Sequence, residues 1–286
     1  MRVDRRVEED GRNRSVVMFE SFTELIDHNR EHDHRSAAMN STFYGAANMK
    51  EADAMARRGL PRDGVEAINL AHDHVSHVAG DLIRPVFDEF YDTSGSFVDM
   101  GRFVDGTPEC MVTYFPTDEP GKSNIVTLIM NISYNCGISA DAIKKNGQSM
   151  MALVEAIETC GLQAEIWADN HVRGSRGGTK VWARTAVKLK RAGEPFDVGM
   201  FMYALTHPSF LRSHIFNAMH NHSSEVRRAC GIAHSGSYGM PVHAAQDMDD
   251  FPPYSIYIPV ISSDSQAGKF VPAVLKQLGL VKADAA

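Results

Sequence analysis

The sequence predicts an α/β fold: a mostly parallel sheet with an antiparallel edge strand, flanked by helices. Three observations predict it. The run Ile125–Met130 is apolar and rich in β-forming residues, which is typical of a strand buried on both faces. Helically spaced apolar residues follow between residues 143 and 157, and then come Gly161 and a second apolar stretch, Leu162–Ala168. Strand, helix and strand form a βαβ unit with parallel strands, and the alternation over Thr179–Lys190 adds the antiparallel edge strand.

The chain divides into three parts in this prediction. Residues 1–14 are almost wholly charged or polar, and we expect a flexible arm there. Residues 15–117 form a helical and irregular N-terminal region, and residues 118–286 form the Rossmann-like α/β domain. The boundary is the stretch 117–122, whose polar, proline- and glycine-containing composition is typical of a linker.

The elements of the N-terminal region follow from local signals. A short helix is predicted to begin after Ser21, because Ser21 and Glu24 have the spacing of a capping box. Apolar periodicity predicts two further helices, over 48–58 and 65–82. Short strands or turns are predicted over 85–116, where small apolar clusters alternate with Gly and Asp.

The second half continues with a hairpin turn at Gly177–Gly178, helices over 195–205 and 208–222, a strand over 254–261 and a helix over 268–280. A series of basic residues accompanies the hairpin. We interpret it as a solvated strand edge rather than a nucleic-acid surface, because lysines on an edge strand discourage pairing with other sheets. It consists of Arg173, Arg176, Lys180, Arg184, Lys188, Lys190 and Arg191.

Composition bounds the class of protein. At 286 residues with 43% hydrophobic content, the chain is long enough for a sizeable core. Its net charge of -7 argues against a general nucleic-acid binder, since phosphate binding needs clustered Lys and Arg. The four cysteines form no CxxC pair, which is typical of free thiols in a reducing compartment. Without an apolar run of membrane-spanning length or an apolar signal core, we expect no membrane contact and a cytoplasmic location.

The candidate site is the turn after the first central strand. Asn131, Ser133 and Asn135 alternate there, directly at the carboxyl end of the strand. Open α/β sheets collect their ligands at this edge. The sequence therefore predicts a binding site formed by this turn.

The second half resembles a von Willebrand factor A domain, an α/β Rossmann-like fold. The resemblance lies in the order strand, helix, strand, edge strand, two helices, strand and helix, and it covers about two thirds of the family fold. It implies a hard-cation site in which Asn131, Ser133 and Asn135 match the first motif, Thr206 the second and Asp264 the last. Because two asparagines replace a carboxylate and a hydroxyl, the implied site is degenerate: it binds a partner without metal, or holds Mg²⁺ weakly through Ser133 and Asp264.

The whole chain also resembles a family of uncharacterised proteins encoded mostly by bacteriophages and mobile elements. The resemblance lies in the opening Phe19–Leu25, the stretches Lys50–Pro61 with Gly64–Val65 and Gly95–Phe103 with Gly106–Met111, and the turn Asn131–Tyr134. It implies a product that acts in the cytoplasm of a bacterial host or is packaged in a virion.

These observations favour a non-enzymatic binding or assembly protein, which uses the carboxyl-end face of its sheet to hold a protein partner or further copies of itself. One alternative is a metal-dependent hydrolase of nucleotides or phosphoesters. It requires Asp264 and Asp169 to meet a histidine at that face, namely His171, His207 or His234. A structural component of the virion is the other alternative.

Overall fold

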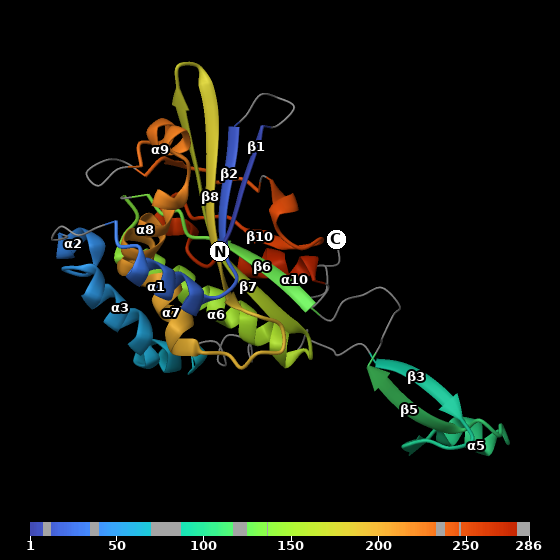
Figure 1. Cartoon of the computed structure of the whole chain (residues 1–286). Helices are drawn as coiled ribbons and strands as arrows, with labels where there is room; N and C mark the ends of the chain where they lie inside the picture. The colour runs from blue at the N-terminus through green and yellow to red at the C-terminus, as the bar shows by residue number, and fades with distance from the viewer. Residues whose placement is uncertain are drawn as a thin grey trace.

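A mixed sheet forms the centre of the molecule. The computed structural model describes residues 1–7, 13–34, 40–69, 87–116, 125–135, 137–232, 238–245 and 247–278. The strands follow one another in the spatial order β1 (Arg2–Val7), β2 (Asn13–Phe19), β8 (Thr179–Lys190), β7 (Gln163–Arg176), β6 (Ile125–Asn131) and β10 (Ile256–Ile258), and the short β9 (Met240–Pro241) pairs with β7. Figure 1 shows the sheet from one side.

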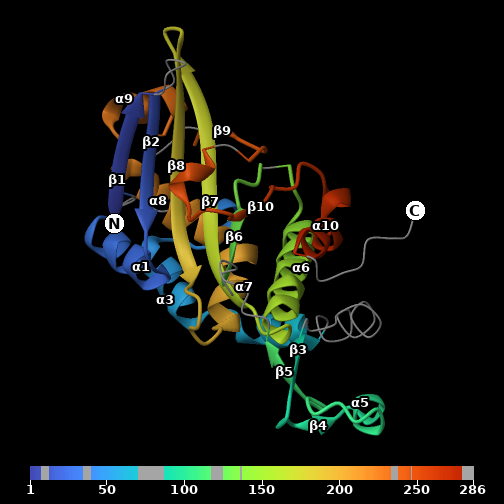
Figure 2. The same ribbon diagram turned by 90° about the vertical axis from the view of Figure 1, so that its right-hand side faces the viewer.

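The predicted fold class is confirmed as α/β with a mixed, mostly parallel sheet. Three pairings are parallel, β2 with β8 and β6 with both β7 and β10, whereas β1–β2 and β7–β8 are antiparallel. The expected βαβ unit consists of β6, α6 (Ala140–Thr159) and β7. β7 and β8 extend beyond their neighbours as a long hairpin, whose turn lies at Gly177 and Gly178 as predicted (Figure 2). Both glycines have positive φ, which this tight turn requires.

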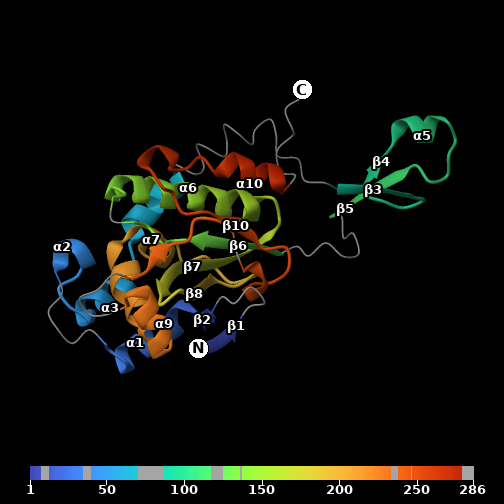
Figure 3. The same ribbon diagram turned by 90° about the horizontal axis from the view of Figure 1, so that it is seen from above.

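The helices that surround the main core lie against one face of the sheet (Figure 3). Along β2, Val17 and Phe19 join this core, whereas Val16 and Met18 point to the opposite face. α10 (Val271–Gln277) packs on α6. Further helical elements outside the small sheet include α1 (Phe22–Glu31), α2 (Ser41–Tyr44), α3 (Met49–Arg58), α7 (Val198–Thr206), η1 (Phe210–Ile215), α8 (Phe216–Ala218), η2 (Met219–Asn221), α9 (Ser224–Cys230) and η4 (Asp264–Gln266).

The opposite face has a thinner cover. A second, small apolar cluster there joins Val16, Ile129 and Trp167 to Phe251. Phe251 follows the short helix η3 (Met248–Asp250), and its ring meets the Trp167 ring edge-on at 5.6 Å. We call this the open face of the sheet, and the segment 247–251 covers part of it.

A second sheet is built from residues 87–116. Its order is β3 (Phe87–Asp92), β5 (Met111–Pro116) and β4 (Phe97–Val98), all antiparallel, and α5 (Met100–Val104) connects β4 to β5. We call it the small-sheet unit. It contains the short strands expected over 85–116, of which residues 87–116 are described, but α5 lies where strands or turns were expected.

Two expectations about the organisation of the chain were wrong. β8 is not a half-exposed edge strand, because β2 pairs with its free side and buries most of it. Residues 1–14 are not simply an arm, because β1 and the start of β2 belong to the sheet. The N-terminal residues Val17, Leu25 and Ala56 also share one hydrophobic core with the α/β region, so that core crosses the division placed at residue 117.

Other local predictions have a simpler outcome. α1 begins with Ser21 as N-cap, whose side chain accepts the Glu24 backbone N–H. The helix predicted over 65–82 is present over 61–69, and its remainder lies outside the described residues, as does the linker 117–122. None of the helices described is long and apolar enough to cross a membrane.

Candidate functional site

Asn131 ends β6 on the open face and is completely buried. Its Nδ2 donates to the Val242 carbonyl oxygen at 2.8 Å and to the Tyr257 hydroxyl at 2.5 Å, while its Oδ1 accepts the Ser133 backbone N–H at 2.8 Å. Burial raises the pKa of Tyr257, and the neighbouring charge of Asp169 raises it further. The buried Asn131 side chain thus links the turn after β6 to the segments that contain Val242 and Tyr257.

The other residues of the predicted site have separate neighbours. Ser133 Oγ is buried and lies 3.0 Å from the His171 backbone nitrogen, which donates to it. Asn135 is exposed and accepts the Gly137 N–H at 2.7 Å. Asp264 lies on η4 and accepts the Ser139 backbone N–H at 3.2 Å. Hydrogen bonding to the side chain and then to the backbone of Ser139 lowers the pKa of Asp264. Thr206 ends α7, in the helical layer, and donates to the Met202 carbonyl at 2.7 Å.

The structure therefore brings Asp264 to the segment that follows β6. Its contact there is with Ser139, the N-cap of α6, rather than with Ser133. Ser133, its proposed partner in a Mg²⁺ site, is engaged with the backbone of β7. Among the described residues, no group of three or more His, Cys, Asp or Glu side chains is arranged to hold a metal ion. Of the residues that the hydrolase alternative requires, Asp169 and His171 lie together, whereas His234 is outside the described residues.

A buried network of charges adjoins Asn131 on the open face. Its centre is Arg184 of β8, whose Nε lies 3.1 Å from Asp169 Oδ1. Its Nη1 pairs with the Asp250 carboxylate and donates to the Asp247 carbonyl at 2.6 Å. Its Nη2 lies 3.3 Å from His171 Nδ1. One guanidinium therefore ties two strands to the segment 247–251.

Arg14 of β2 extends this network across the sheet. It pairs with the Asp250 carboxylate, and its Nη1 lies 3.8 Å from Asp247 Oδ1 and 3.4 Å from the more exposed Asp249. The network thus contains two arginines and three aspartates whose side chains are at most 7% exposed, and these are Arg14, Arg184, Asp169, Asp247 and Asp250.

The electrostatics of the network are set by burial. Burial raises the pKa of Asp169 above its ordinary value, and the opposing effect of Arg184 does not cancel this rise. For Arg184, burial acts to lower the pKa, but the charges of Asp169, Asp250 and Asp247 together raise it. Buried charges stabilise the fold only while each one keeps its partner of opposite charge, because an unpaired buried charge is strongly destabilising. The network therefore fastens the segment 247–251 onto the sheet.

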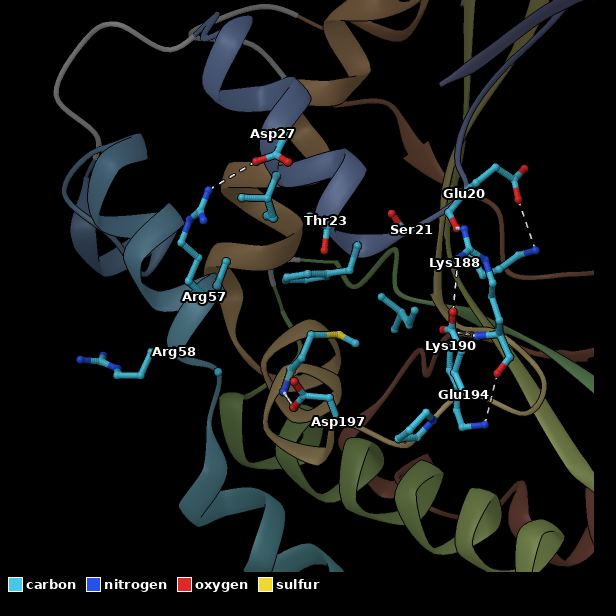
Figure 4. Close-up of a pocket in the computed structure, with 18 residues that line it drawn as sticks. Glu20, Ser21, Thr23, Asp27, Arg57, Arg58, Lys188, Lys190, Glu194 and Asp197 are labelled. Atoms are coloured by element: carbon cyan, nitrogen blue, oxygen red, sulfur yellow. Dashed lines mark hydrogen bonds and ion pairs between the residues drawn. The ribbon is translucent and has the colours of Figure 1, made fainter.

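A pocket of about 690 Å³ lies at the carboxyl ends of β2 and β8, at the opposite end of these strands from Arg14 (Figure 4). Its walls include the first turn of α1, the last turn of α3 and the start of α7. The volume is in the range of small-molecule sites. Ser21 and Asp197 line it but also cap α1 and α7, so their side-chain oxygens already accept backbone N–H groups.

Most cations of the pocket are paired with carboxylates. Lys188 Nζ lies 3.2 Å from Glu20 and 3.3 Å from Glu165, and Arg57 Nη2 lies 3.4 Å from Asp27. Lys190 is 4% exposed and pairs with Glu158 at 2.7 Å. An anionic ligand would have to displace these carboxylates, so the pocket offers space rather than uncompensated charge.

Comparison with known proteins gives a family for this chain. The family model described as a domain of unknown function, DUF7192, matches residues 4–282. The chain belongs to this family. No curated protein and no solved structure matches it. The match runs through both sheets, so the DUF7192 domain includes the small-sheet unit as well as the central sheet.

Sequence reasoning missed the buried network of this DUF7192 chain. Arg184 was placed among solvated edge residues, because alternation shows which residues share a face but not whether another strand lies alongside. A usable signal was Arg14, a charged residue two positions before the apolar run Val16–Phe19. Four consecutive apolar residues of this kind are consistent with a buried strand, and this strand is the missing neighbour of β8.

Proposed function

We propose that this chain is a non-enzymatic binding or assembly protein that holds a protein partner. The observation that carries the proposal is the surface of the small-sheet unit. Six large apolar side chains of this unit are between 46% and 77% exposed, and these are Phe90, Phe97, Val98, Met100, Phe103 and Val104. Grouped apolar side chains at a protein surface are typical of interaction sites.

The construction of the unit supports the same proposal. A three-stranded sheet becomes stable when it has an apolar face that packs against something. Within the unit, Val112 is the one large apolar side chain recorded as buried among those described. Arg102 stacks over the Tyr91 ring at 3.7 Å, which stiffens the surface without covering it. A partner that covers the apolar side chains would supply the missing packing.

The carboxyl-end face of the sheet is the second part of the proposed surface. Asn135 and Asp264 are exposed there, and Asp264 is hydrogen-bonded to Ser139, the N-cap of α6. Asn131 and Ser133 support this face from inside through their hydrogen bonds. We assign partner contact to the two exposed residues, and a positioning role to the two buried ones.

The proposed setting is a bacteriophage product in the cytoplasm of a bacterial host, or in the virion. It rests on the sequence resemblance to phage-encoded proteins. The resemblance to a von Willebrand factor A domain rests on the order β6, α6, β7, β8, α7, β10 and α10. The phage setting and the likeness to a von Willebrand factor A domain are both parts of the proposal.

The test compares two variants in the full-length protein. Phe103→Ser combined with Val104→Ser removes two exposed apolar side chains from the unit, and Val65→Ser, at a site 60% exposed outside it, is the matched control. Light scattering over a concentration series reports self-association, and quantitative affinity capture from cells that express the protein reports other partners. We expect the double variant to lose a complex that the wild type and Val65→Ser retain. Identical behaviour of all three proteins would contradict the proposal.

A further inference from the structure

A basic patch lies at the far end of the β7–β8 hairpin. Arg173, Arg176 and Lys180 are exposed on the hairpin, and Arg227 and Arg228 come from α9. None of these five side chains pairs with a carboxylate among the described residues, although the chain carries a net charge of -7. Side chains alternate along the two strands, so Arg176 lies on the side of the hairpin that α9 covers, whereas Arg173 and Lys180 lie on the other side. Arg176 therefore forms the basic patch with Arg227 and Arg228. Cations that have no carboxylate partner among the described residues produce a locally positive field in an acidic protein, which steers a negatively charged partner.

The patch is held in place by close backbone packing. α9 lies so near the hairpin that a Cβ on Gly174 would meet the Ala229 carbonyl oxygen at 2.3 Å. Between α9 and the hairpin lies a small pocket of about 230 Å³, lined by Arg176 and Arg228 and by Val181, Glu225 and Ala229. The two arginines therefore flank a cavity large enough for a side chain of a partner.

The small-sheet unit has the opposite charge. Within residues 87–116 the one basic residue is Arg102, against six acidic residues, which are Asp88, Glu89, Asp92, Asp99, Asp105 and Glu109. The apolar side chains that carry the proposed function lie on this same unit. An acidic and apolar surface is complementary to a surface that combines unpaired arginines with a small cavity.

We propose that the basic patch of one copy docks on the acidic small-sheet unit of a second copy. The inference rests on the proposed function, and it names the partner as this chain itself. The two surfaces differ, so the contact is heterologous. One copy of a pair keeps its unit free and the other keeps its patch free, so further copies add head to tail. Arginines fix the direction of docking, and the exposed phenylalanines contribute the apolar contact.

The test uses charge reversal on each surface in the full chain. Arg176→Glu with Arg228→Glu reverses the patch. Asp105→Lys with Glu109→Lys reverses part of the unit, at two exposed carboxylates without partners among the described side chains. The matched control is Lys50→Glu with Lys276→Glu, which makes the same change in net charge as the patch variant at exposed positions outside both surfaces.

Sedimentation velocity at low and high salt measures the association. We expect concentration-dependent assembly of the wild type that weakens as salt rises, and a weakening of about tenfold or more in each reversed variant. The control variant should assemble like the wild type. A mixture of the two reversed variants should assemble again, because each patch then faces a unit of opposite charge. This restoration separates a direct contact from a general effect of charge.

Other outcomes overturn the inference. Wild-type assembly that is unchanged in both reversed variants would place the contact elsewhere, while the proposed function would stand if Phe103→Ser with Val104→Ser still disrupts it. A wild type that stays monomeric at every concentration would overturn docking between copies, and the capture experiment would then decide the proposed function. Tight binding of a short duplex DNA that only the patch reversal abolishes would assign the patch to nucleic acid instead.

Discussion

The two ends of β8 carry the same type of residue and differ in almost everything else. At one end Lys180 is exposed and has no ion pair among the described residues. Further along the strand, Arg184 and Lys190 are 1% and 4% exposed and are paired with carboxylates. The difference arises from their neighbours, because β2 and β7 flank the strand and the segment 247–251 covers Arg184, whereas the hairpin tip extends beyond them. A basic residue on this strand is therefore structural or available for binding according to what lies beside it.

This contrast separates two kinds of consequence. Loss of a paired and buried charge leaves its partner without compensation, so it lowers stability. Loss of an exposed and unpaired charge leaves the fold almost unchanged and alters only what the surface attracts. The buried end should thus respond in unfolding experiments, and the exposed end in association experiments.

The largest effect is expected for Arg184→Met. The substitution leaves Asp169 and Asp250 buried without their shared guanidinium and should lower the free energy of unfolding by about 3–5 kcal/mol. Urea denaturation followed by circular dichroism measures the change. The exposed counterpart, Arg176→Met, should stay within about 0.5 kcal/mol of the wild type.

A double variant isolates the charge effect from packing. Arg184→Met combined with Asp169→Asn removes the uncompensated Asp169 charge together with its partner and leaves Asp250 paired with Arg14, so it should recover part of the lost stability. If the double variant is less stable than Arg184→Met alone, the network stabilises the fold through its shape and hydrogen bonds rather than through charge balance.

Sequence alone predicted the βαβ unit, because a fully apolar strand and a long helical stripe are local signals. It predicted the hairpin turn for the same reason, since two consecutive glycines favour one turn type. It missed that β2 lies beside β8, because the two strands are separated by most of the chain and their pairing leaves no local trace. The edge-strand error follows directly: the alternation of β8 was interpreted without knowledge of its second neighbour.

The sequence indicated where two residues of the candidate site lie, and their role in binding stays a prediction. Asn131 does stand at the carboxyl end of a strand, and Asp264 does come to the turn that follows. A sequence does not show whether an amide faces solvent or another backbone, and Asn131 and Ser133 are occupied by internal hydrogen bonds. The charges of Arg14 and Arg184 found partners more than two hundred and more than sixty residues away, respectively. Pairings over such distances depend on the finished fold.

A second effect, of intermediate size, is expected from buried His214. Burial lowers its pKa from 6.5 to about 4, and the hydrogen bond with the Ala52 backbone, which acts to raise the pKa, does not offset this. The unfolded chain therefore binds a proton below pH 6.5 that the folded chain refuses until about pH 4. Stability should fall as pH falls through this window, by up to about 3 kcal/mol.

Unfolding at a series of pH values measures this loss, and His214→Gln serves as the comparison. The variant should lose less stability than the wild type between these pH values, because glutamine does not titrate. Equal pH profiles of the two proteins would mean that the acid sensitivity comes from other groups, such as the buried aspartates.

The smallest effect compares the two lysines of β8 directly. Lys190 Nζ donates to the Ala164 carbonyl at 3.1 Å and pairs with Glu158, whereas Lys180 is exposed. Lys190→Gln is too short to reach both acceptors and should lower the free energy of unfolding by about 1–3 kcal/mol, since a buried carbonyl loses its donor. Lys180→Gln should change it by less than about 0.5 kcal/mol. Both variants remove one positive charge from the same strand. A difference between their losses of stability in thermal unfolding therefore cannot arise from the change in net charge. Equal losses in the two would show that burial beside β2 and β7 does not decide the role of a basic residue on this strand.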